Sequence, residues 1–257
     1  MLFVPLCLCA FVVQAEENIT VAVASSFYKQ AKIYAAQFET RHDVKVRLIA
    51  GSTGRLYNQI QQGAPFDIFI AADKQRPALL HREHKRMGEA YLGIQVGKNL
   101  SNVEALQKNS IQHVAIANPD VAPFGLAAKA MLQSQGLWEL LKPKLVYAQN
   151  AMQAAMMVEQ GLTDAGFVPT ADKTHALATV PYVAALLSDK ANAQLFYQVL
   201  GSEASASPSK QSHSATKVAP PSGSEVSTSP IEQSYSATKV APPSGSEALA
   251  SPNYNKP

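Results

Sequence analysis

The chain has 257 residues, of which 47% are hydrophobic and 16% charged, and its formal net charge is +3. This composition is typical of a folded protein with one large domain or two modest lobes, each with its own core. The net charge is small and no basic cluster with interleaved aromatic residues occurs, which argues against a nucleic-acid-binding protein.

The first 15 residues, MLFVPLCLCAFVVQA, are uncharged and almost wholly apolar. They are too short to span a bilayer as a helix, and they end in a small-residue pattern typical of signal-peptide cleavage. We therefore predict a signal peptide over residues 1–15 and a periplasmic or otherwise extracytoplasmic protein; an ordinary buried segment is the alternative. Cys7 and Cys9 both lie in this segment, so we expect the mature chain to have neither a disulfide nor a thiolate metal site.

Residues 19–200 alternate predicted strands with predicted helices. In the first half, the apolar strands are ITVAVA (19–24), VKVRLIA (44–50) and DIFIA (67–71). After the first strand, apolar residues recur at helical spacing: Phe27, Ala31, Tyr34, Ala35 and Phe38. The second strand leads through GSTG (51–54) into a short helix that ends at Gly63. Asp73 follows the third strand, where its carboxylate is placed to cap the next helix.

The strand and helix pattern then restarts. The second set of strands is HVAIAN (113–118), KLVYAQ (144–149) and DAGFV (164–168). The helices between them are LAAKAMLQSQG (126–136) and AMQAAMMVEQG (151–161). Two successive sets of this kind predict an α/β protein with two lobes, each built on a parallel-rich sheet.

The composition changes sharply near Gly201. Residues 207–257 contain 13 Ser and 8 Pro, and QSHSATKVAPPSGSE (211–225) returns as QSYSATKVAPPSGSE (233–247). Such a segment cannot bury enough apolar surface to offset the entropy lost on ordering. We predict that residues 207–257 form a disordered, low-complexity tail that acts as a linker or spacer.

Four strand-to-helix junctions carry small polar or turn residues. They are Ser25-Ser26, Ser52-Thr53, Pro123-Phe124-Gly125 and Asn150-Ala151. Ligands of open α/β sheets bind outside the carboxyl ends of the strands, so two junctions from each lobe could face one small ligand across a cleft. Apart from Arg55, no Lys or Arg lies at these junctions. Hydroxyls and helix N-termini are suited to a fully charged oxyanion. Taken singly, however, a Ser, Thr or Asn before a helix is a cap far more often than a ligand, and Asn150 is well placed to cap the helix that follows it.

Several stretches resemble the molybdate-binding proteins of bacterial ABC importers, an extracytoplasmic class of solute receptors. They are ITVAVASSF, GSTGRLYNQIQQGAPFDIFIAAD, VAIANPDVAPFGLAAKAML and MVEQGLTDAGFV. The resemblance implies a two-lobed periplasmic-binding-protein fold that closes on molybdate or tungstate. It also implies a monomer with no cofactor, which delivers the anion to the membrane permease of an ABC importer. Lobe 1 would then comprise residues 19–91 and 181–206, and lobe 2 residues 92–180.

The resemblance also implies which residues contact the anion. In lobe 1 these are the hydroxyls of Ser26 and Thr53, with Ser52 beside Thr53. In lobe 2 they are the backbone N–H groups of Phe124 and Ala151. Ser26 and Thr53 would contact the metal in the form of molybdate, through the oxygen atoms of the anion, and not as ligands of a free metal ion. Some members of the family add a tyrosine hydroxyl after the strand that matches GFV, where this chain has Pro169 and therefore lacks that donor.

Two departures from the family leave a second interpretation open. Segment 87–99 is shorter than usual, and we expect the missing part to be the strand that crosses between the lobes. After FYQVLGSEA the family's final helical stretch is replaced by the Ser/Pro repeat. The alternative is a divergent, non-binding relative that acts as a secreted structural or interaction protein through its tail.

Catalysis has little support in the sequence. HREH (81–84) would place His81 and His84 on one predicted helix as a metal pair, but the basic residues around them favour a solvated surface. The chain has no HExxH or GxSxG motif. We therefore expect a binding protein with no catalytic residues.

Overall fold

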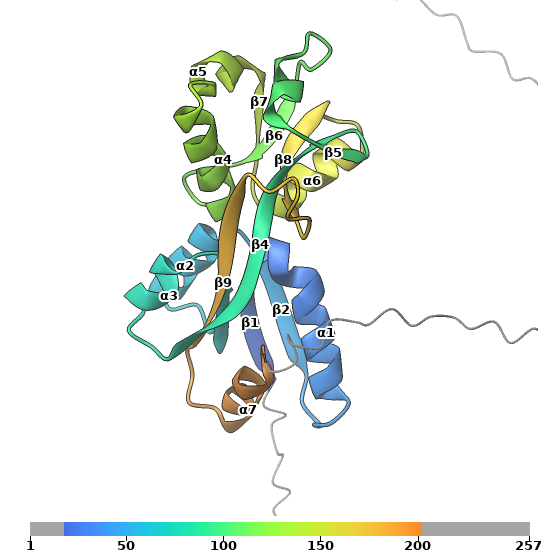
Figure 1. Cartoon of the computed structure of the whole chain (residues 1–257). Helices are drawn as coiled ribbons and strands as arrows, with labels where there is room; N and C mark the ends of the chain where they lie inside the picture. Colours follow the sequence, from blue (N-terminus) through green and yellow to red (C-terminus); the bar gives the residue numbers. More distant parts are fainter. Residues whose placement is uncertain (1–17, 202–257) are drawn as a thin grey trace, which may run out of the picture. The chain divides into compact units, whose positions relative to one another are not determined.

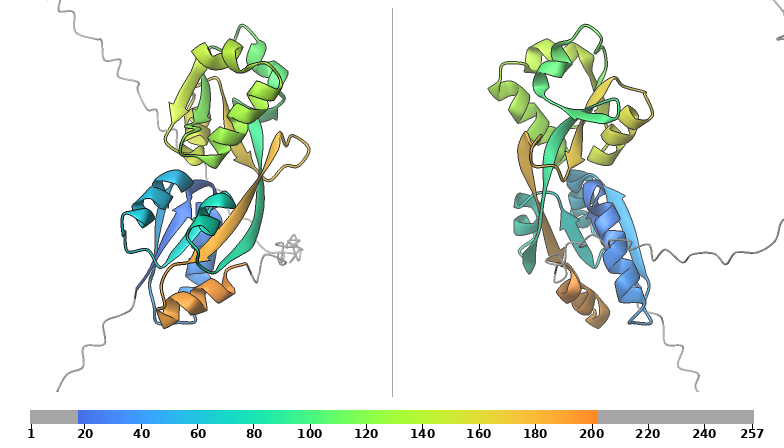
Figure 2. Two further views of the ribbon diagram at one scale, coloured as in Figure 1. Left: turned by 90° about the vertical axis from the view of Figure 1, so that its left-hand side faces the viewer. Right: turned by 45° about the vertical axis from the view of Figure 1, so that its right-hand side comes forward.

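The computed structural model describes residues 18–201 (Figure 1). The predicted signal peptide (1–15), the predicted tail (207–257) and the end of predicted lobe 1 (202–206) lie outside the described residues. Figures 1 and 2 show two groups of helices and strands, which we call lobe 1 and lobe 2, joined by two long strands.

Lobe 1 is built on three parallel strands. They are β1 (Ile19–Ala24), β2 (Val46–Gly51) and β3 (Ile68–Ala71). Its helices are α1 (Tyr28–Glu39), α2 (Thr53–Gln61), α3 (Gln75–Leu79) and α7 (Ala191–Val199). β1 pairs with β2 on one side and with β3 on the other. Because β1 is central, its apolar run is buried along nearly its whole length, as parallel strands covered on both faces require.

Lobe 2 repeats this plan with three strands and a short edge strand. They are β5 (Asn99–Ser101), β6 (Val114–Ala117), β7 (Leu145–Ala148) and β8 (Ala165–Thr170). Its helices are α4 (Pro123–Ser134), α5 (Trp138–Leu141) and α6 (Ala151–Glu159). Short 3-10 helices lie at Val103–Gln107 and Lys142–Lys144 in lobe 2 and at Ser25–Phe27 in lobe 1. β6 is parallel to both β7 and β8, so each lobe has the parallel core that the sequence predicts.

Two antiparallel strands, β4 (His84–Val96) and β9 (Ala178–Leu186), connect the lobes. β9 pairs with β3 of lobe 1, β4 pairs with β8 of lobe 2, and the two pair with each other. The result is one continuous sheet in the order β2-β1-β3-β9-β4-β8-β6-β7, with β5 added at β4. The exact residues at which one lobe ends and the other begins stay a prediction.

The expectation that the shortened segment lacks the crossing strand is wrong. β4 has 13 residues and runs through the whole of 87–96. A bulge between Arg86 and Gly88, where Gly88 has φ +121°, shifts the register of β4 against β9, and the strand continues to pair with β9 on both sides of it. The predicted helix through HREH is also wrong, because α3 ends at Leu79, His81 has a positive φ of 51° and His84 begins β4.

Buried polar contacts fix the strands of lobe 1 at their ends. Asp67, 3% exposed, accepts a hydrogen bond from the amide of Thr20 (2.8 Å) and pairs with Lys190 just before α7 (Nζ–Oδ1 3.0 Å). Asp73 accepts a hydrogen bond from the amide of Arg76 (2.9 Å) in the first turn of α3. Asp67 therefore has a structural role at the start of β3, and Asp73 caps the first turn of α3, as the sequence predicts.

Candidate functional site

The two polar junctions of lobe 1 emerge side by side. The parallel register pairs Ala24 at the end of β1 with Gly51 at the end of β2. The next residues in each strand direction are therefore Ser25 and Ser52, at the same edge of the sheet. Ser25 is 8%, Ser52 4% and Thr53 1% exposed. Buried hydroxyls normally have hydrogen-bond partners, so a buried hydroxyl without a partner in the protein points to a ligand.

Thr53 and Ser52 differ in how their hydroxyls are paired. Thr53, the first residue of α2, accepts a hydrogen bond at Oγ1 from the amide of Ala72 (3.0 Å). Since that bond uses an oxygen lone pair, the hydroxyl proton of Thr53 remains free to bind an acceptor. Ser52 precedes α2 without capping it, and its buried Oγ has no hydrogen-bond partner within residues 18–201. At this edge of lobe 1, the Thr53 hydroxyl can therefore donate a hydrogen bond, and the Ser52 hydroxyl can still form one.

The junctions of lobe 2 place two helix N-termini together. β6 and β7 are paired up to Ala117 and Ala148. Phe124 is the second residue of α4 and Ala151 the first of α6, and both are buried. Amides in the first turn of a helix have no acceptor inside the helix, so they can bind an anion. Asn150 caps α6 as predicted, with Oδ1 accepting from the amide of Gln153 (3.0 Å).

Direct contacts join these helix ends across the two lobes. The amide of Gly54 in α2 donates to the carbonyl of Val121, in the loop before α4 (2.8 Å). The neighbouring Arg55 donates from Nη1 to Oε1 of Gln149 (3.1 Å), which adds a second hydrogen bond between the lobes. α6 in turn contacts the Ser25–Phe27 turn. All four predicted junctions therefore lie where the lobes meet.

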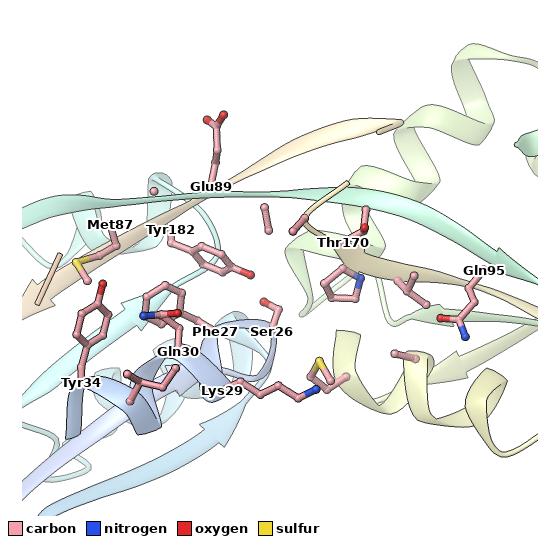
Figure 3. Close-up of a pocket in the computed structure, with 18 of the residues that line it drawn as sticks. Ser26, Phe27, Lys29, Gln30, Tyr34, Met87, Glu89, Gln95, Thr170 and Tyr182 are labelled. Atoms are coloured by element: carbon pink, nitrogen blue, oxygen red, sulfur yellow. The ribbon is translucent and has the colours of Figure 1, made fainter. Parts of the chain in front are cut away.

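A cleft of about 930 Å³ opens beside Ser26, as Figure 3 shows. Residues of α1, β4, α6, β8 and β9 line it, so both lobes contribute to its walls. Ser26 lines the cleft, whereas Ser52, Thr53, Phe124 and Ala151 do not. Pro169 lies on its wall in β8, at the position where a tyrosine hydroxyl is missing. The roles of the five predicted residues as anion ligands stay predictions.

Tyr182 of β9 is a polar group of this cleft that the sequence analysis missed. Figure 3 shows its hydroxyl pointing toward Ser26. Burial raises the pKa of Tyr182 to about 12, an effect that the adjacent Ser26 hydroxyl partly opposes. Its segment, VPYVAALL (180–187), has the composition of a buried strand, in which a tyrosine is indistinguishable from a core residue. Only the pairing of β9 reveals its place.

Neither a metal-binding cluster nor a membrane-spanning helix occurs among the described residues. No group of three or more His, Cys, Asp or Glu side chains within residues 18–201 is arranged to hold a metal ion. In the same part of the chain, no helix combines the length and the apolar composition needed to cross a membrane.

Comparisons with known proteins agree with this geometry. The family model for bacterial extracellular solute-binding proteins matches residues 19–242. The molybdate-binding protein ModA of Azotobacter vinelandii is 39% identical over 171 residues, which cover 63% of this chain and 68% of that protein. ModA of Rhodobacter capsulatus is 34% identical, and the match covers 60% of this chain and 65% of that protein. The chain thus spans about two thirds of the length of these relatives.

A solved structure confirms the predicted fold class. The periplasmic molybdate-binding protein of Azotobacter vinelandii superposes with a TM-score of 0.64 and 26% sequence identity, covering 70% of this chain and 91% of that protein. This agreement includes the two-lobed α/β architecture and the resemblance first seen in the junction sequences. The chain therefore belongs to the family of bacterial extracellular solute-binding proteins.

Proposed function

We propose that this protein binds molybdate or tungstate outside the cytoplasm and delivers the anion to the membrane permease of an ABC importer. The observation that carries the proposal is the direct contact between the helix N-terminal ends of the two lobes, in which the amide of Gly54 in α2 donates to the carbonyl of Val121 just before α4 (2.8 Å). The curated relatives, named as molybdate-binding proteins, support the choice of anion. We further infer that the protein acts as a monomer, without catalysis and without a cofactor.

The chemistry of the junctions explains how a dianion can bind without a salt bridge. A fully ionised tetrahedral oxyanion offers only acceptors, whereas Ser26, Thr53 and the helix N-termini offer donors. Hydrogen bonds to a charged acceptor are stronger than neutral ones, and the partial positive charge of helix ends adds to them. Closure of the two lobes about β4 and β9 would exclude water and strengthen every such bond.

The proposal predicts a higher melting temperature in the presence of molybdate or tungstate. A ligand that binds only the native state stabilises it by about 2.7 kcal/mol at 100 times its dissociation constant. For a folded part of this size that corresponds to a rise of roughly 5–11 °C. A thermal-shift series with molybdate, tungstate, sulfate and phosphate measures this directly. If no anion raises the melting temperature, the protein is a non-binding relative and the proposal is wrong.

Ser26→Ala should weaken molybdate binding by about 10- to 150-fold, because a hydroxyl bond to a charged acceptor contributes roughly 1.5–3 kcal/mol. Isothermal titration calorimetry gives the dissociation constants. Ser134→Ala is the matched control, since it removes a serine that bonds only to the carbonyl of Met131 at the far end of α4 (2.8 Å). Equal affinities for wild type and Ser26→Ala would restrict Ser26 to a structural role at the turn before α1.

A further inference from the structure

The Tyr182 hydroxyl is buried and has no hydrogen-bond partner among the described residues. Tyr182 is 5% exposed, and its Oη is fully buried. Although Ser26 lies beside it, Oη has no partner of acceptable distance and angle within residues 18–201. A buried donor left unpaired destabilises a protein, and an acceptor bound at this position would remove that cost.

We propose that Tyr182 is a further ligand-binding residue, whose hydroxyl donates to the oxyanion bound at Ser26. The inference rests on the proposed function and adds a residue from β9 to a site otherwise assembled from helix N-termini. It also gives the cleft a tyrosine donor from a connecting strand, whereas Pro169 of β8, which lines the same cleft, has no donor to offer.

Strand pairing places Tyr182 close to the rest of the site. The antiparallel register pairs Ala71 at the end of β3 with Val183 of β9. Tyr182 therefore follows next to Ala72, the residue whose amide bonds to Oγ1 of Thr53. The Tyr182 side chain thus begins beside the backbone that anchors the Thr53 hydroxyl and ends beside Ser26.

Aromatic packing holds the Tyr182 ring in this orientation. Its ring lies 4.7 Å, centroid to centroid, from the ring of Phe27, at an interplanar angle of 58°. Phe27 directly follows Ser26, so the same turn positions both the serine hydroxyl and the surface on which the tyrosine packs. A donor fixed in this way loses little conformational entropy when an anion binds.

The Tyr182 hydroxyl also remains a donor over the whole physiological pH range. Burial raises its pKa to about 12, so the phenol is protonated at every pH well below that value. A phenolate could only accept hydrogen bonds and would repel an anion. The contribution of Tyr182 to affinity should therefore be constant between about pH 6 and pH 9.

Tyr197 of α7 provides a matched control. Its hydroxyl is likewise buried and unpartnered within the described residues, and burial raises its pKa to about 12 as well. Tyr197 does not line the cleft beside Ser26; its ring packs under Lys85, whose Nζ is 4.5 Å from the ring centroid. The two tyrosines share their chemistry and differ in location.

The test compares Tyr182→Phe with Tyr197→Phe in the full chain. We expect Tyr182→Phe to weaken molybdate binding about 10- to 150-fold by calorimetry, and Tyr197→Phe to leave it within twofold. Without ligand, the melting temperature of Tyr182→Phe should be equal to or above that of wild type, because the substitution removes an unpaired buried hydroxyl. A structural hydroxyl would lower it.

Three outcomes would overturn the inference. If Tyr182→Phe binds molybdate as tightly as wild type while Ser26→Ala does not, the hydroxyl is not a ligand and the proposed function stands. If Tyr182→Phe melts several degrees lower without ligand, the hydroxyl stabilises the fold. If wild type binds neither molybdate nor tungstate, the proposed function fails and this inference fails with it.

Discussion

Gly125→Ala is expected to lower the free energy of unfolding by about 3 kcal/mol, which corresponds to a fall of roughly 6–12 °C in the melting temperature. Gly125 is the third residue of α4, and its backbone lies directly against the end of β6. A Cβ added there would sit 1.9 Å from the carbonyl oxygen of Ala117 and 2.7 Å from its carbonyl carbon. Backbone atoms cannot rotate away, so α4 would have to move from the sheet.

Differential scanning calorimetry without ligand measures this effect. Gly51→Ala is the control, because the three atoms nearest to its added Cβ all belong to the side chain of Leu56, the nearest at 3.2 Å, and none is a backbone atom. Leu56 is buried, but its side chain needs to move by only a few tenths of an ångström, so we expect a smaller fall in melting temperature than for Gly125→Ala. Since Gly125 follows Phe124, displacement of α4 should also weaken anion binding. Equal melting temperatures for Gly125→Ala and wild type would show that this contact is not as close as described.

Local sequence signals predicted most of the elements. The apolar runs of β1 and β6 and the helical spacing of α1 depend on neighbours in the chain, which a sequence displays directly. The same holds for Asn150, whose cap of α6 requires only residues three positions away. These features determine each lobe separately, and they account for the correct fold class.

Features that depend on distant strand pairing could not be predicted. β4 carries charged and exposed residues over its first half, so its pattern did not indicate a strand. It exists because β9 and β8 supply hydrogen-bond partners about 70 to 100 residues away in the sequence. Tyr182 was missed for the same reason, because its position beside Ser26 follows from the register of β9. The sequence analysis could name the hydroxyls of the site but not the groups that surround them.

Gly54→Ala is expected to weaken molybdate binding about 5- to 150-fold while changing the melting temperature of the ligand-free protein by less than about 2 °C. A Cβ at Gly54 would sit 2.7 Å from the carbonyl oxygen and 2.9 Å from Cα of Val121, in the other lobe. Such overpacking costs about 1–3 kcal/mol wherever the lobes stay in contact. Opening of the lobes relieves it, so only the closed, ligand-bound state is destabilised.

The comparison of Gly54→Ala with Gly125→Ala separates closure from folding. Both substitutions add one methyl group near the N-terminus of a helix, at α2 and α4, and both place it against backbone atoms. The clash at Gly125 lies within lobe 2 and persists in every native conformation, so it must appear in the melting temperature without ligand. The clash at Gly54 lies between lobes, so calorimetric titration with molybdate should reveal it instead. If Gly54→Ala lowers the ligand-free melting temperature as much as Gly125→Ala does, the lobes form one rigid body and closure does not accompany binding.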